Sequence, residues 1–200
     1  MLGLSLAVAQ ARARDTSGVA AIASALLSGV AMPAASRTSG LPADVERALT
    51  SYRRRERLFN QTVHPPRNPM KDRTWRVEGL RRVVFALFDR PDSRQLSADL
   101  MSKLRVLDEW EGMASSPLEE AASADAFLIG DPDSPVADYV RLFSASRKLC
   151  AVSGLAGLDS ASTEGHQVAA AADADLALAS RSSQVLIRVA AQQLSRSRAC

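Results

Sequence analysis

The sequence predicts an all-α protein: an antiparallel bundle of about five helices that follows an N-terminal targeting-like segment and ends in a long Ala-rich helix. Along residues 43–200, apolar side chains recur three or four positions apart, the spacing that places them on one face of a helix. Aromatic residues make up only 4% of the chain, whereas sheets favour aromatic and β-branched residues. No alternating strand pattern of five or more residues stands out. These features argue against a strand-rich sandwich or barrel.

Residues 1–42 are typical of a presequence. Arg12 and Arg14 precede 21 uncharged residues between Asp15 and Arg37, with an apolar centre and small residues near their end. A positively charged start, an apolar core and small residues before a cleavage site characterise targeting peptides. We therefore expect residues 1–42 to be removed and residues 43–200 to form a single helical domain. The alternatives are a retained membrane anchor and an Ala-rich helix packed in the fold.

Three helices are expected in the first half of this domain. The first covers residues 45–59 and ends before a segment with three prolines, which fix φ and remove hydrogen-bond donors. The second covers residues 75–88. The third is capped by Asp92 or Ser93, ends at Gly112 and carries four leucines on one face. These leucines are Leu96, Leu100, Leu104 and Leu107.

The second half predicts three more helical segments. Ser116-Pro117-Leu118-Glu119 fits a capping box with proline at the first helical position, so a helix is expected from there to Leu128. Ser134-Pro135 predicts the start of the next helix, which reaches about Val152. From Val168 to Leu194, apolar and small residues keep a helical spacing and predict one final helix of roughly 30 residues.

Charge separates into two blocks. Residues 53–82 contain ten basic residues and three acidic ones, and residues 108–138 contain nine acidic residues and no basic one. Such blocks can face each other inside one molecule, present two patches to partners, or pair in a self-complementary dimer. The candidate basic interaction patch is Arg53, Arg54, Arg55, Arg57, Arg73, Arg76, Arg81 and Arg82. The candidate acidic patch is Asp108, Glu109, Glu111, Glu119 and Glu120.

No catalytic motif is found, and the interpretation leans away from an enzyme. His64 and His166 lack a ligand-type neighbour three or four positions on, so we expect no metal or other cofactor. Cys150 and Cys200 are the two cysteines of the chain. An oxidising compartment would permit them to pair, and the alternative is two unpaired thiols.

These observations favour a non-catalytic helical protein that acts as an accessory or docking subunit of a protein assembly. We expect that assembly to be membrane-associated, and the protein to reach it after export or organelle import. The partner is a protein, a membrane complex or a second copy of the chain. The first alternative is a nucleic-acid-binding protein that uses the arginines of residues 53–82, and the second is an enzyme or ligand binder with no recognisable motif. A presequence places the protein in the periplasm or in an organelle lumen such as that of the thylakoid; otherwise it is membrane-anchored or cytoplasmic.

Overall fold

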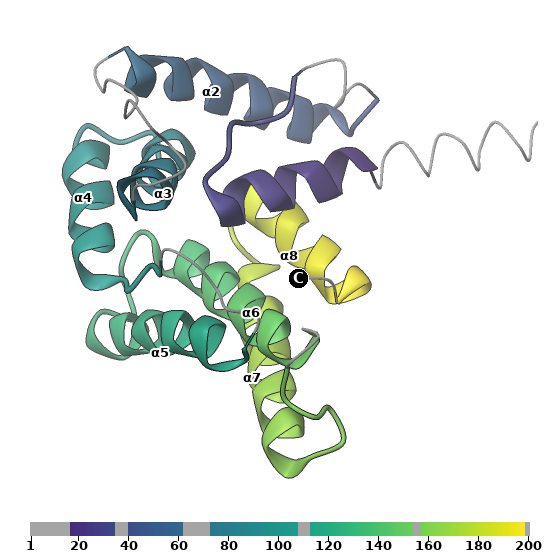
Figure 1. Cartoon of the computed structure of the whole chain (residues 1–200). Helices are drawn as coiled ribbons and strands as arrows, with labels where there is room; N and C mark the ends of the chain where they lie inside the picture. The colour runs from purple at the N-terminus through teal and green to yellow at the C-terminus, as the bar shows by residue number, and fades with distance from the viewer. Residues whose placement is uncertain (1–16, 35–39, 62–72, 108–112, 154–156, 199–200) are drawn as a thin grey trace, which may run out of the picture.

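The protein is built from helices. A computed structural model describes residues 17–34, 40–61, 73–107, 113–153 and 157–198, and within these ranges it contains eight helices and no strand (Figure 1). The all-α prediction is confirmed. A helix over residues 17–28 comes first. The others are α2 (Ala43–Asn60), α3 (Arg73–Leu87), α4 (Ser93–Lys103), α5 (Ser115–Gly130), α6 (Ala137–Ser153), α7 (Thr163–Ala179) and α8 (Val185–Ser197).

Helix α6 is the centre of the bundle. It packs against α5, α7 and α8, and every residue from Leu142 to Ala151 is buried. A helix buried on all sides is normally apolar around its whole circumference. The sequence of α6 departs from that rule at Arg147 and Lys148, which are both buried. Two cations in the centre of the fold require anionic partners close by.

Helices α2, α3 and α4 form a second layer, in which α3 packs against both of the others. The predicted apolar stripe of α2 is confirmed, because Val45, Leu49, Tyr52 and Phe59 are all buried. Glu56 lies on the same buried face, which the apolar pattern alone did not predict.

The helix over residues 17–28 belongs to the hydrophobic core. Ile22 and Leu26 are completely buried, and Ala25 is nearly so. Figure 1 draws this helix in purple between α2 and α8. This position agrees with the alternative in which residues 1–42 contribute an Ala-rich helix packed in the fold. Removal of residues 1–42 stays a prediction, and it would take this helix out of the core.

The helix ends at Gly29, which adopts a left-handed conformation with φ of 70° and donates its N–H to Ala25 O. Glycine is the usual residue at this position because it has no Cβ to oppose positive φ. The Gly29 backbone also lies against α3 at Gly79, so closely that a Cβ on Gly79 would overlap the Gly29 carbonyl oxygen. Two glycines thus allow the two backbones to touch.

The predicted final helix is two helices, which corrects the expectation of one continuous element. Helix α7 ends at Ala179 and α8 begins at Val185. In the turn between them, the Ser180 hydroxyl donates to Ala177 O and the Ser182 hydroxyl accepts from Gln184 N. Serine side chains compete in this way with the helical hydrogen bonds of the backbone. Ser183 is small enough to continue the spacing of small residues across the break.

Two further boundaries differ from the prediction. Helix α4 ends at Lys103, because Leu104 is extended and the next residues bind α5: Arg105 N donates to the Ser123 hydroxyl and Leu107 N to Glu120 Oε1. Helix α5 begins at Ser115, before the predicted capping serine, and no side chain caps its N-terminus. Of the four predicted leucines, Leu96 and Leu100 therefore belong to α4, whereas Leu104 and Leu107 lie in the segment 104–107 after it. We call this segment the strap.

Candidate functional site

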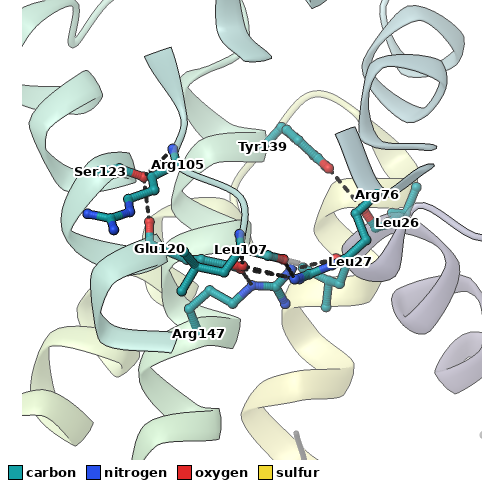
Figure 2. A network of polar contacts seen from close by, with 9 residues as sticks. All are labelled: Leu26, Leu27, Arg76, Arg105, Leu107, Glu120, Ser123, Tyr139 and Arg147. Atoms are coloured by element: carbon teal, nitrogen blue, oxygen red, sulfur yellow. Dashed lines mark hydrogen bonds and ion pairs between the residues drawn. The ribbon is translucent and has the colours of Figure 1, made fainter. Parts of the chain in front are cut away.

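The polar centre of the molecule is an ion cluster around Glu120. This glutamate is 0% exposed. Arg147 Nε donates to its Oε2 at 2.7 Å, and Arg76 Nη1 donates to its Oε1 at 3.1 Å (Figure 2). Leu107 N donates to the same Oε1 at 2.8 Å, and Arg76 also donates to Leu107 O. The cluster thus joins α3, α5, α6 and the strap after α4.

Burial of this cluster has an energetic consequence. A buried carboxylate is tolerated when several donors replace the water that it loses, and Glu120 receives donors from three segments. Arg147 is 4% exposed, and its burial lowers the pKa of the guanidinium, while the charge of Glu120 acts in the opposite direction. Arginine remains charged in proteins. Loss of Glu120 would leave two arginines without their shared anion, and loss of Arg147 would leave Glu120 with one cation fewer.

The same arginine holds the carboxyl end of the helix over residues 17–28. Arg147 Nη2 donates to Leu27 O at 2.9 Å, and the Tyr139 hydroxyl donates to Leu26 O at 2.9 Å. Arg82 Nη2 donates to Gly29 O at 2.6 Å. The last carbonyls of a helix have no partner within the helix and carry a partial negative charge. Side chains from α3 and α6 therefore cap this helix end.

The chain after this helix is fixed to α2. Glu56 accepts a hydrogen bond from Met32 N at 3.3 Å and pairs with Arg82 at 3.3 Å, and Arg53 donates to Pro33 O at 2.7 Å. Burial raises the pKa of Glu56. The Met32 N–H and the nearby arginines lower it by a smaller amount, so the pKa stays above its ordinary value.

Most of the predicted basic patch is used inside the molecule. Arg53, Arg76 and Arg82 make the contacts described above. Arg55 caps α3, because its guanidinium donates to Phe85 O and Phe88 O and pairs with Asp89. Arg81 pairs with Glu78 on its own helix. The side chain of Arg73 lies outside the described residues. Of the seven predicted arginines whose side chains are described, Arg54 and Arg57 are exposed.

The acidic patch is divided in a similar way. Glu119 pairs with Arg105 at 3.1 Å on the surface, whereas Glu120 is at the centre of the buried cluster. Asp108, Glu109 and Glu111 lie outside the described residues. The contact of Arg76 with Glu120 joins the basic block to the acidic block within one molecule, the first of the three arrangements that the sequence left open.

The outer side of α2 carries what remains of the basic patch. Arg47, Arg54 and Arg57 are exposed together with Leu58, and residues at this spacing share one face of a helix. Within the described part of the chain, these three arginines have neither an ion pair nor a hydrogen bond from their side chains. We call these four residues the α2 arginine face.

A groove of about 590 Å³ opens between the helix over residues 17–28, α3, α6 and α8. Its floor includes Leu27, Cys150 and Leu194, which are buried, and Trp75 stands at its edge with 38% of its surface exposed. Arg76 and Arg147 of the ion cluster border it. We call this the N-terminal groove.

The remaining candidate residues are the cysteines. Cys150 is disulfide-bonded in the structure. Cys200, the second cysteine of the chain, lies outside the described residues, so their pairing stays a prediction.

The residues that organise this centre were not identified as functional candidates from the sequence. Arg147 and Lys148 fall inside the predicted helix that reaches about Val152, and two adjacent cations in that helix are the signal that could have found them. Lys148 Nζ donates to Asp175 at 2.7 Å and to Asp125 at 3.0 Å, so it links α5, α6 and α7. Tyr139 and Glu56 gave no comparable signal, because their partners lie more than 20 residues away.

No group of three or more His, Cys, Asp or Glu residues in the described ranges is placed to hold a metal ion. Among the same residues, none of the helices combines the length and the apolar character that a membrane span requires. No family model matches the chain, and no curated protein or solved structure is significantly similar to it. The geometry defines a helical domain organised around a buried ion cluster, with a basic helix face and an apolar groove on its surface.

Proposed function

We propose that the protein is a non-catalytic accessory subunit that docks to an acidic surface of another protein through the α2 arginine face. The observation that carries this proposal is the presence of three exposed arginines on one helix face without acidic partners in the described residues. Arg54 and Arg57 are three positions apart, and like charges at this spacing destabilise a helix slightly. An acidic partner surface would offset that repulsion and form bidentate contacts with the guanidinium groups.

A protein partner fits this face better than a nucleic acid does. Proteins that bind single strands combine cations with exposed aromatic rings on which bases stack. Tyr52 and Phe59, the aromatic residues interleaved with these arginines, are both buried on the opposite face of α2. Leu58 is 45% exposed beside the arginines and adds apolar contact area.

Delivery across a membrane, and association with a membrane complex, also belong to the proposal. They are supported by the sequence pattern of residues 1–42 and by no contact described above. A presequence that ends near residue 42 would include the buried helix over residues 17–28, so the site of cleavage is testable apart from the docking surface.

Site-specific photocrosslinking in the source cells tests the docking surface. A photoreactive phenylalanine at Thr50, which is exposed between the arginines, should give a discrete protein adduct, and the same group at exposed Gln167 on α7 should not. Arg54→Glu combined with Arg57→Glu should abolish the adduct, because charge reversal repels an acidic partner. Arg181→Glu, at another exposed arginine, is the matched control. An adduct that nuclease removes, or an adduct unchanged by charge reversal, would contradict the proposal.

A further inference from the structure

The N-terminal groove has the size and the construction of a ligand site. Its volume of about 590 Å³ lies inside the range of roughly 300 to 1,000 Å³ that is typical of small-molecule pockets. Four helices contribute to it: the helix over residues 17–28, α3, α6 and α8. The groove is separate from the α2 arginine face, because no residue of α2 lines it.

Small side chains keep the groove open along the helix over residues 17–28. The lining residues of this helix are Ala20, Ala23, Ser24, Leu27 and Ser28. These positions repeat at intervals of three and one, so they form one face of the helix. Leu27, Leu194 and Cys150 supply a buried apolar floor. Such a surface favours hydrocarbon over water.

One polar group on α6 reaches this floor without a partner. Ser146 lines the groove and is only 4% exposed, and no hydrogen bond within the described residues engages its hydroxyl. Its Oγ keeps contact with solvent, so the polar end of a ligand that enters the groove can reach it and form a hydrogen bond. Arg147 and Arg76 are already engaged by Glu120, so on α6 the hydroxyl of Ser146 is the side-chain group that can bind the polar end of a ligand. Ser24 and Gln193 are further polar groups of the lining.

We propose that the N-terminal groove binds a small single-chain amphiphile, with its alkyl chain on the apolar floor and its hydroxyl or carboxyl group hydrogen-bonded to Ser146. An alkyl chain is narrow enough to reach a floor shared by four helices. A partner helix, about 10 Å across with its side chains, would stay at the rim. This site does not depend on the docking proposal, and it gives the protein a ligand in addition to the proposed protein partner.

Trp75 at the edge of the groove serves as the reporter. The chain contains two tryptophans, so Trp110→Phe leaves Trp75 as the sole indole in the full-length protein. Titration with 1-dodecanol and with lauric acid, below the concentrations at which they aggregate, should change the Trp75 emission and saturate at one ligand per chain. Equal affinity for the two probes indicates a contact with a neutral polar group, as expected for Ser146, and preference for lauric acid assigns an additional role to the bordering arginines.

Two kinds of variant decide whether the groove is the site. Ala20→Phe should fill it and weaken binding at least about tenfold, whereas Ala48→Phe makes the same change in a second cavity, between α2, α3 and α8, and should leave the affinity unchanged. Ser146→Ala should weaken binding about two- to tenfold through loss of the hydrogen bond. Ser24→Phe on the exposed rim gives a second block if Ala20→Phe unfolds the protein, as judged by circular dichroism. Absence of saturable binding, or binding that neither blocking variant weakens, would overturn the assignment.

Discussion

Arg147 on α6 donates to the carbonyl oxygen of Leu27, 120 residues earlier in the chain, while its Nε binds Glu120. One side chain thus connects the end of the first described helix to the central ion cluster. Because the cluster also contains Arg76 and Leu107, five parts of the chain depend on one buried arrangement of charge: the helix over residues 17–28, α3, the strap after α4, α5 and α6.

Loss of the Arg147 side chain should be strongly destabilising. Arg147→Met keeps the apolar part of the side chain but leaves Glu120 with one cation fewer, and removal of one partner from a buried ion pair costs about 3 to 5 kcal/mol. The free energy of unfolding in urea measures this loss. Arg181→Met, at an exposed arginine of the turn before α8, should change it by less than about 0.5 kcal/mol. Equal effects of the two substitutions would show that the cluster contributes nothing specific.

The contact between two glycine backbones makes a second prediction. In Gly79→Ala, the new methyl group would overlap the Gly29 carbonyl oxygen, so α3 and the first described helix must separate. Overpacking of this kind costs about 1 to 3 kcal/mol, which the denaturation midpoint reports. Gly130→Ala adds the same methyl group where no atom lies within 4 Å and is the matched control. Similar midpoints for the two variants would contradict the close approach.

Glu56 should give the protein a distinctive pH dependence. Burial raises its pKa in the folded state above the ordinary value of 4.5, so at intermediate pH the folded state holds more protons than the unfolded state. Its contribution to stability therefore falls as pH rises from about 4.5 through the raised pKa. Glu56→Gln removes this titration. As pH rises across that window, wild type should lose stability relative to Glu56→Gln, as measured by the unfolding free energies of the two proteins. A difference between them that does not change with pH would contradict the raised pKa.

The cysteines permit a direct chemical test. If Cys150 pairs with Cys200, the intact protein should gain 2 Da on reduction, and Cys150→Ser should abolish that gain. The bridge would close a loop of about 50 residues, for which chain entropy gives at most about 4 kcal/mol of stabilisation. A disulfide-linked dimer on a non-reducing gel would show that the pairing is between chains instead.

Truncation tests the role of the first described helix. A chain that begins at residue 17 should keep the cooperative unfolding of the full chain. A chain that begins at residue 37 lacks the acceptors Leu26 O, Leu27 O and Gly29 O, which leaves Tyr139, Arg147 and Arg82 without these partners. It should lose the sharp thermal transition and expose apolar surface to a fluorescent dye. Equal transition temperatures for the two truncated chains would support a presequence that extends through this helix.

Local pattern predicted the helices and not the contacts between them. The apolar stripe of α2 could be predicted because its members repeat at helical spacing, namely Val45, Leu49, Tyr52 and Phe59. The end of α4 was not, because it depends on hydrogen bonds from Arg105 N and Leu107 N to side chains of α5. The serine turn after Ala179 was missed for another reason: serine is small enough to continue an alanine stripe.

The candidate site was predictable only in part. Separation of charge into two blocks was visible in the sequence, but which arginine would be buried was decided by contacts such as that of Arg76 with Glu120, 44 residues apart. The burial of residues 17–28 was likewise decided by contacts with residues far away in the sequence. Their composition favoured a targeting peptide over a close-packed core helix, whereas the burial of Ile22 and Leu26 and the donors on α3 and α6 favour the core helix.

Backbone amide hydrogen exchange of the full-length protein tests whether the helix over residues 17–28 is built into the core. Because Ile22, Leu26 and Leu27 are buried and this helix end is capped by Tyr139, Arg147 and Arg82, the amides of residues 22–27 should exchange as slowly as those of residues 142–151 in α6. Exchange of residues 22–27 at the rate of an unfolded chain, with α6 still protected, would show that this helix is not part of the core.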